Sequence, residues 1–141
     1  MTTSTSRLDL PTGPVIGAGS VTGGVQLILR LEGGAVLAAA AAFYFNAGFS
    51  WVLFAVLFLT PDLSMLGYLA GPRIGAAAYN LVHTYAVALA LAGAGFFAGL
   101  PLVEAVGVIF LAHIGFDRAL GYGLKYRSAF ADTHLGRIGR R

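Results

Sequence analysis

The sequence contains no cysteine and few charged residues. Without cysteine, the chain forms no disulfide, holds no metal through thiolates and has no thiol nucleophile. Charged residues make up 11% and hydrophobic residues 57% of its 141 residues. Soluble domains have about 25% charged residues, and one of this size cannot bury so much apolar surface, which a lipid bilayer accepts. The composition therefore predicts an integral membrane protein.

The N-terminal stretch also lacks the pattern of a secretory signal. Residues 1–24 contain no basic segment that leads into an apolar one. They are rich in Thr, Ser, Gly and Pro, a composition typical of segments without a packed core. We expect a flexible N-terminal tail over residues 1–24.

Four apolar segments approach the length of about 20 residues that a helix needs to cross a membrane. We expect helices over residues 25–45, 49–69, 74–97 and 102–124, in a membrane domain of residues 25–126 that precedes a basic tail of residues 127–141. Within the second segment, Thr60, Pro61 and Asp62 form a helix-start pattern, which predicts a break there. Short connections force neighbouring helices to be antiparallel. The expected fold is all-α, a four-helix antiparallel bundle with a broken second helix.

The basic residues fall on one side of this arrangement. All nine lie near the termini or the turn between the second and third helices: Arg7, Arg30, Arg73, Arg118, Lys125, Arg127, Arg137, Arg140 and Arg141. The two turns on the other side contain no Lys or Arg. Since basic loops stay in the cytoplasm, we expect a multi-pass protein with both termini cytoplasmic.

Ionisable side chains on three predicted helices reach a similar depth. At about 1.5 Å per residue, Asp62 lies about 10 Å and His83 about 13 Å from the cytoplasmic boundary, and His113 is similarly deep. Asp117 follows His113 by four residues and shares its face of the helix. Charged groups at this depth are costly unless they pair or face a wet cavity, which predicts a cytoplasm-facing pocket. Its expected residues are Asp62, Asn80, His83, His113 and Asp117, with Tyr79 beside them.

Further polar residues are expected around this pocket. Arg30, Glu32, Arg73 and Arg118 would line its mouth, and Tyr122 and Lys125 lie on the adjacent stripe of the fourth helix. We predict ligand contacts from Asn80, Tyr79, Arg73, Arg118, Tyr122 and Lys125. Asp132 and His134 either fold back over the mouth or belong to a solvated tail near anionic lipid.

Small residues predict close helix packing. Gly95 and Gly99 are four apart, and the first helix contains a run of alanines. Such surfaces let backbones approach one another, either inside the bundle or between copies in a homo-oligomer.

Long, specific runs link the chain to a family. They are LTPDLSMLGYLAGPRIGAAAYNLVHTY, LAHIGFDRALGYGLKY and DTHLG, preceded by LRLEGGAVLAAA. Over residues 27–136 the chain resembles a family of small bacterial membrane proteins, domain of unknown function 4260. The resemblance implies four membrane helices and a bacterial source, hence the inner membrane, but it implies no activity.

Two functions are consistent with the polar residues. In the first, the protein is a binding or accessory membrane protein whose pocket takes a small anionic or amphiphilic ligand. In the second it is a membrane-embedded enzyme. There His113, oriented by Asp117, acts as a base, with His83 as its acid partner and Asp62 as a second carboxylate.

A metal form of the enzyme would use His83, His113 and Asp62 or Asp117, with His134 as a further candidate. Imidazole and carboxylate suit zinc, iron or manganese, although HxxxH and ExxH spacings are absent. Ser64 is the nearest serine to Asp62, and it is not an evident nucleophile. Proton-linked transport and haem ligation by the two histidines are further alternatives.

Each signal also has a purely structural interpretation. A histidine in a membrane helix often only bonds a neighbouring helix, and Glu104 has a favourable position in the first turn of the fourth helix. The functional hypotheses therefore depend on the convergence of these residues. Nothing indicates nucleic-acid binding, because the basic residues lie at the membrane edge.

Overall fold

The computed structural model describes residues 19–139 of the chain, and these are mostly helical. The helices are α1 (Gly23–Asn46), α2 (Trp51–Leu57), the 3-10 helix η1 (Thr60–Ala70), α3 (Pro72–Val82), α4 (Tyr85–Phe97) and α5 (Pro101–Leu120). The short strands β1 (Asp132–Thr133) and β2 (Gly136–Arg137) form an antiparallel pair. Most of the predicted N-terminal tail, with Arg7, and the terminal Arg140 and Arg141 lie outside the described residues.

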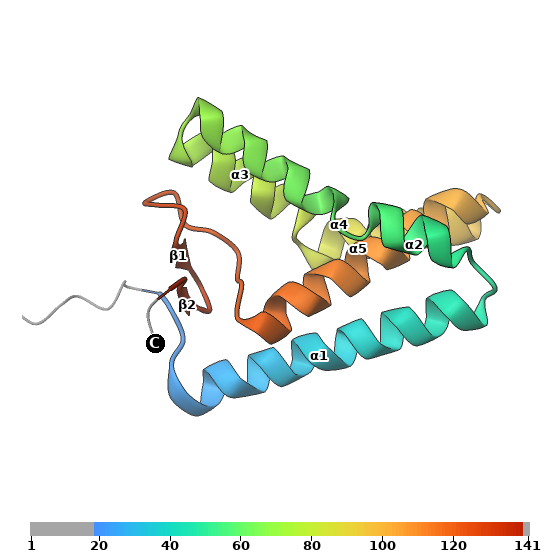
Figure 1. Cartoon of the computed structure of the whole chain (residues 1–141), viewed down its shortest axis with the longest axis horizontal. Coiled ribbons are helices and arrows are strands. Elements are labelled where there is room, and N and C mark those ends of the chain that lie inside the picture. Colours follow the sequence, from blue (N-terminus) through green and yellow to red (C-terminus); the bar gives the residue numbers. More distant parts are fainter. Residues whose placement is uncertain (1–18, 140–141) are drawn as a thin grey trace, which may run out of the picture.

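Helix α5 is the centre of the molecule. Helices α1 and α4 pack along it, while η1 packs along α3 (Figure 1). The loops after α1 and α4 lie at one end of the molecule. The start of α1, the connection between η1 and α3 and the segment after α5 lie toward the other end (Figure 1). The chain therefore reverses direction after α1 and again after α4 (Figure 1).

Within residues 19–139, two helices, or three, have the length and apolar composition of membrane spans. Helix α1 and the continuous segment Trp51–Ala70 qualify singly, and α3 with α4 qualifies as one span bent by 41°. Helix α5 is not among them, and its sequence carries Glu104, Asp117 and Arg118. Asp117 and Arg118 are among the buried residues of α5, so packing within the protein surrounds them, whereas Glu104 is only partly buried.

The second segment is broken as predicted. Helix α2 ends at Leu57, and η1 begins at Thr60 with Pro61 in its first turn. Thr60, however, does not cap the new helix: its hydroxyl donates a 2.7 Å hydrogen bond back to the Leu57 carbonyl. The expected α-helix is also replaced by eleven residues of 3-10 helix, a tighter form that usually occurs in short pieces.

The expectation of a continuous third helix over residues 74–97 is wrong. Helix α3 ends at Val82 and α4 begins at Tyr85. Thr84 between them has an extended backbone, with φ −98° and ψ 134°. Neither proline nor glycine lies at this break, so the strongest signals of a helix end are missing from the sequence there.

The fourth helix ends at Leu120, four residues earlier than expected. Gly121 follows in the left-handed conformation, with φ +96°, and its N–H donates to the Arg118 carbonyl. The N–H of Tyr122 donates to the Asp117 carbonyl at 2.7 Å. Glycine adopts this conformation without steric cost and commonly terminates helices in this way. The early end lets the chain turn back toward the site.

Glycine allows α4 and α5 to touch through their backbones. A Cβ atom at Gly95 would lie 2.1 Å from the Glu104 nitrogen, and one at Gly107 would lie 2.2 Å from the Ala92 nitrogen. Gly95 thus packs inside the protomer. Gly99 instead lies in the turn after α4, with φ +66° and open space around it.

Candidate functional site

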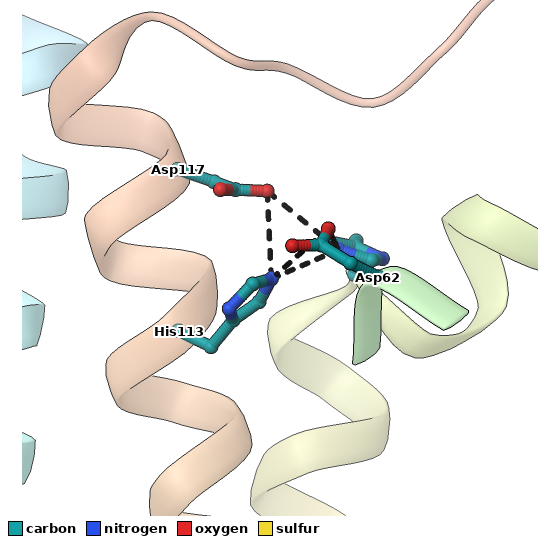
Figure 2. Close-up of side chains that lie close together, drawn as sticks. Asp62, His113 and Asp117 are labelled. Atoms are coloured by element: carbon teal, nitrogen blue, oxygen red, sulfur yellow. Dashed lines mark hydrogen bonds and ion pairs between the residues drawn. The ribbon is translucent and has the colours of Figure 1, made fainter. Parts of the chain in front are cut away.

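Four ionisable side chains meet at one point in the protein. His83 Nε2 lies 3.1 Å from His113 Nε2 and 3.4 Å from Asp62 Oδ1. Asp117 Oδ2 lies 3.6 Å from His83 Nε2 and 3.7 Å from His113 Nε2. His113 Nε2 also lies 3.5 Å from Asp62 Oδ1. Figure 2 shows Asp62, His113 and Asp117 with their polar atoms turned toward one another.

The two helix breaks position half of this cluster. Asp62 lies in the first turn of η1, directly after the first break, and His83 lies in the break between α3 and α4. His113 and Asp117 are one turn apart on the central helix α5. Both histidines and Asp117 are buried, whereas the side chain of Asp62 is 34% exposed. Asp62 is therefore the residue of the cluster that is accessible from outside it.

Hydrogen bonding at Nδ1 leaves the Nε2 atom of His83 with a lone pair, which faces His113 Nε2 at 3.1 Å and can accept its proton or bind a metal ion. Its Nδ1–H donates to the Tyr79 carbonyl at 2.9 Å, which assigns the proton to Nδ1 and a lone pair to Nε2. The Tyr79 ring stacks on the imidazole, with centroids 3.6 Å apart. One residue of α3 thus fixes both the tautomer and the plane of His83.

Tyr79 also supports Asp117. Its hydroxyl donates a 2.9 Å hydrogen bond to Asp117 Oδ2, the oxygen that faces the two imidazoles. His113 has a different environment: Phe58 contacts it edge-on at 5.5 Å. Among the described residues, its buried Nδ1 has no hydrogen-bond partner, and neither has Asp62 Oδ1. The cluster therefore contains an unsatisfied carboxylate oxygen at its centre.

These donors suit a divalent transition-metal ion. Bonds of about 2.0–2.1 Å to a tetrahedral ion place neighbouring ligand atoms about 3.3 Å apart, and five of the separations here are 3.1–3.7 Å. The one ligand atom that each of the four residues offers lies within 4.8 Å of all the others. Asp62, His83, His113 and Asp117 can therefore bind one ion together.

Asn80 supports the site from outside the cluster. Its side chain donates to the Lys125 carbonyl at 2.9 Å and accepts from the Lys125 N–H at 2.7 Å. Asn80 thus forms a backbone clamp, and its contact with a ligand remains a prediction. The clamp holds Lys125 against α3, and Lys125 is buried.

Lys125 and Tyr122 line a cavity beside the cluster. The cavity measures about 270 Å³, and its other lining residues are Asp62, Met65, Tyr79, Asp117, Phe130 and Ile138. The ammonium of Lys125 donates to the Phe130 carbonyl at 3.0 Å and lies 3.6 Å from the centre of the Phe130 ring. Burial lowers the pKa of Lys125, and the two nearby carboxylates oppose this effect.

The arginines predicted at the mouth have other positions. Arg118 is buried, and its guanidinium donates to the carbonyls of His83 and Tyr122 at 3.3 and 3.5 Å. It thereby stabilises the helix break at His83. Arg73 is exposed and is not among the residues that line the cavity beside the cluster. Arg30 donates to the Ala119 carbonyl, and Glu32 is exposed.

The segment after α5 folds back over the site. Lys125 pairs with Thr133 as an isolated bridge, and the Leu124 N–H donates to His134 Nδ1 at 2.8 Å. His134 is therefore a structural residue of this segment and lies outside the cluster. Asp132 bonds Ser128 and Arg137. Of the two positions considered for the tail, the structure has the folded one.

Some cavity residues were not predicted. Phe130 and Ile138 belong to the C-terminal segment, where strands of two residues leave no periodic pattern. The DTHLG run was the available signal that the C-terminal segment is folded, because it places polar residues and a glycine turn after α5. Ser64 has a buried hydroxyl without a partner among the described residues and lies outside the cluster.

Comparison with known proteins identifies a family for nearly the whole chain. The family model described as "Domain of unknown function (DUF4260)" matches residues 26–138. Neither the curated proteins nor the solved structures contain a match. The match includes all four residues of the cluster and the segment that covers it. The chain therefore belongs to the family defined by domain of unknown function 4260.

Proposed function

We propose that this protein is an integral membrane protein that binds one divalent transition-metal ion through Asp62, His83, His113 and Asp117. The observation that carries the proposal is the spacing of the four donor groups, with five separations of 3.1–3.7 Å. Two imidazoles and two carboxylates suit zinc, iron or manganese.

The charges of the cluster favour an ion over a hydrogen-bonded network. Two carboxylates that lie together in a mostly buried site repel one another and lose solvation. A divalent cation neutralises both, whereas two neutral imidazoles offer at most one N–H each to the centre. The Nδ1–H of His83 donates to the Tyr79 carbonyl, outside the cluster. Its Nε2 lone pair is therefore directed at the centre of the cluster, which further favours a cation there.

The membrane topology of the proposal has four spans. They are α1, the α2–η1 segment, the bent α3–α4 pair and the central α5. The two or three apolar candidate spans support this arrangement, and the basic residues near the site end of the molecule support cytoplasmic termini. With the family resemblance, this favours the inner membrane of a bacterium.

An enzymatic role is the second candidate. The cavity of about 270 Å³ touches two of the proposed ligands, Asp62 and Asp117, so a small molecule could reach a bound ion. A metal ion of this kind supplies Lewis acidity and lowers the pKa of bound water. The metal-free alternatives are an acid–base pair of His113 and Asp117, or a ligand-binding or accessory protein as the sequence predicted.

Elemental analysis and an absorption spectrum of the detergent-purified protein test the proposal. We expect about one equivalent of metal in the wild type, and its loss in His83→Ala and His113→Ala, because each removes one of four ligands. The matched control is His134→Ala, which removes the third histidine and should retain the metal. A wild-type protein that is purified without metal and binds no added Zn²⁺, Mn²⁺ or Fe²⁺ would refute the metal site. An absorption spectrum typical of haem would instead favour haem ligation by the two histidines.

A further inference from the structure

The cavity beside the cluster has one strongly positive group in its wall. Lys125 is 4% exposed, which is unusual for a lysine because its charge is costly to bury. Its ammonium has three N–H donors, and one donates to the Phe130 carbonyl. The ion pairs within residues 19–139 do not include Lys125. A buried cation thus faces the cavity without a bound counter-charge.

The structure holds this cation in a fixed place. Asn80 bonds both backbone groups of Lys125, and the bridge to Thr133 ties it to the C-terminal segment. The aromatic rings of Phe130 and Tyr79 lie 3.6 and 4.8 Å from the ammonium. These contacts favour a cation over a neutral amine and limit the positions that the side chain can reach.

The local charges predict the sign of the ligand. Two carboxylates and a divalent ion sum to zero, and Lys125 adds one positive charge to the wall of the same cavity. The buried guanidinium of Arg118, which interacts with Asp117, adds a second positive charge. The metal-loaded site therefore has a net positive charge that attracts an anion. Without the ion, the two carboxylates offset the two cations, and this attraction is lost.

The size of the cavity limits the ligand. Pockets for drug-sized molecules have volumes of about 300–1,000 Å³, and this one measures about 270 Å³. Met65, Phe130 and Ile138 give it apolar walls next to the charged groups. The space suits one oxyanion group with a short apolar substituent.

We propose that this cavity binds an oxyanion, a phosphate or carboxylate group, between the ion of the Asp62–His83–His113–Asp117 cluster and the ammonium of Lys125. The inference rests on the proposed metal site and names the ligand class of that site. A lipid headgroup and a small soluble anion both supply this chemistry.

Cobalt-substituted protein in detergent provides the first test, because Co²⁺ reports changes of its ligands in its visible spectrum. Metal binding is first measured alone. Inorganic phosphate and acetate are then titrated, and we expect a saturable spectral change in the wild type. Lys125→Met should retain Co²⁺ and weaken the anion affinity at least about 10-fold, as expected for loss of a charge-assisted contact. Lys125→Arg should recover part of it.

Arg127→Met is the matched control, since Arg127 is exposed and carries the same charge two residues away; it should leave the anion affinity unchanged. If Co²⁺ does not bind, both the metal site and the oxyanion site are refuted. If Co²⁺ binds but neither anion changes its spectrum, or Lys125→Met binds them like the wild type, only the oxyanion site is refuted.

Nanodiscs distinguish the two sources of the anion. If a lipid headgroup occupies the site, the Co²⁺ spectrum in phosphatidylglycerol will differ from that in phosphatidylcholine, and added phosphate will have a weaker effect in the former. A soluble ligand predicts the same phosphate titration in both lipids. Either result supports an oxyanion site, provided that Lys125→Met weakens the response as it does in detergent.

Discussion

The hydroxyl of Tyr79 donates a 2.9 Å hydrogen bond to Asp117 Oδ2, the carboxylate oxygen that faces both imidazoles. This bond leaves the other lone pairs of the carboxylate available to an ion and restricts its rotation. Outer partners of this kind typically raise metal affinity by about 10- to 100-fold. Tyr79 is therefore a positioning residue for the proposed site.

Replacing Tyr79 by Phe tests that role. The ring that stacks on His83 is retained, so we expect a folded protein whose metal affinity is at least about 10-fold lower. Competition with a coloured chelator measures the affinity. The control is Tyr122→Phe, which removes the hydroxyl of another tyrosine that lines the cavity but is not hydrogen-bonded to the Asp117 side chain, and which should leave metal affinity unchanged. Equal affinity in wild type and Tyr79→Phe would contradict the positioning role.

The contact between α4 and α5 predicts a sharp difference between two glycines of α4. Gly95→Ala places a methyl group against the α5 backbone, and overpacking of this kind costs about 1–3 kcal/mol. Gly93→Ala meets nothing within 4 Å and should be neutral or stabilising, because alanine favours the helix. Thermal unfolding in detergent measures both variants. Similar midpoints would show that the backbones do not touch there.

The Asn80 clamp predicts a local effect on the segment after α5. Asn80→Ala removes the partners of both backbone groups of Lys125, at a cost of about 1–3 kcal/mol if they stay unsatisfied. We expect faster hydrogen exchange over residues 124–134 and little change in α1. Asn46→Ala, at the exposed end of α1, is the control. Uniformly faster exchange throughout the chain would indicate a global effect and contradict the clamp.

His134 predicts a dependence of stability on pH. Burial, and then the charge of Arg118, lower the pKa of His134, so the folded state binds this proton less readily than the unfolded state. Its contribution is fully present above the ordinary histidine pKa of about 6.5 and is lost as pH falls through that value toward the lower folded pKa.

Unfolding midpoints of wild type and His134→Asn, followed from about pH 8 to pH 5, measure this contribution. Asparagine retains a side-chain acceptor for the Leu124 N–H but does not titrate. The midpoint should therefore fall less steeply in the variant than in the wild type. Because the two proteins differ only at residue 134, the difference between the two curves isolates the contribution of His134. Parallel curves would contradict the prediction.

The absence of cysteine makes the topology easy to test. Single cysteines at Ala47, in the loop after α1, and at Arg127, after α5, are both in exposed positions. In intact spheroplasts, a membrane-impermeant maleimide should label Ala47→Cys, whereas Arg127→Cys should react only after permeabilisation. The reverse pattern would place the termini outside.

The convergence of the site could be predicted from the sequence. Helical rise alone places Asp62, His83 and His113 at one depth, and the four-residue spacing places Asp117 on the face of His113. The predicted approach of these side chains is confirmed by their separations of 3.1–3.7 Å. Their roles remain proposals.

Other features depend on tertiary contacts that leave little local pattern. The break at His83 has no proline or glycine, and it is stabilised from α5 by Arg118. The C-terminal segment is held by Asn80 and by its own short bridges. Arg73 is exposed and is not among the residues that line the cavity beside the cluster, because depth along a helix does not specify the direction of a side chain that follows the Gly71 turn.

The distribution of contacts divides the described residues into two parts. Helices α1 and α4 pack on α5, and η1 packs on α3, while few contacts join these two groups. Asp62 and His83 belong to the η1–α3 part, and His113 and Asp117 belong to α5. Each part thus contributes one carboxylate and one imidazole. An ion bound at their junction would fasten the η1–α3 hairpin to the rest of the protein, so that metal supply would determine how firmly these two parts are held together.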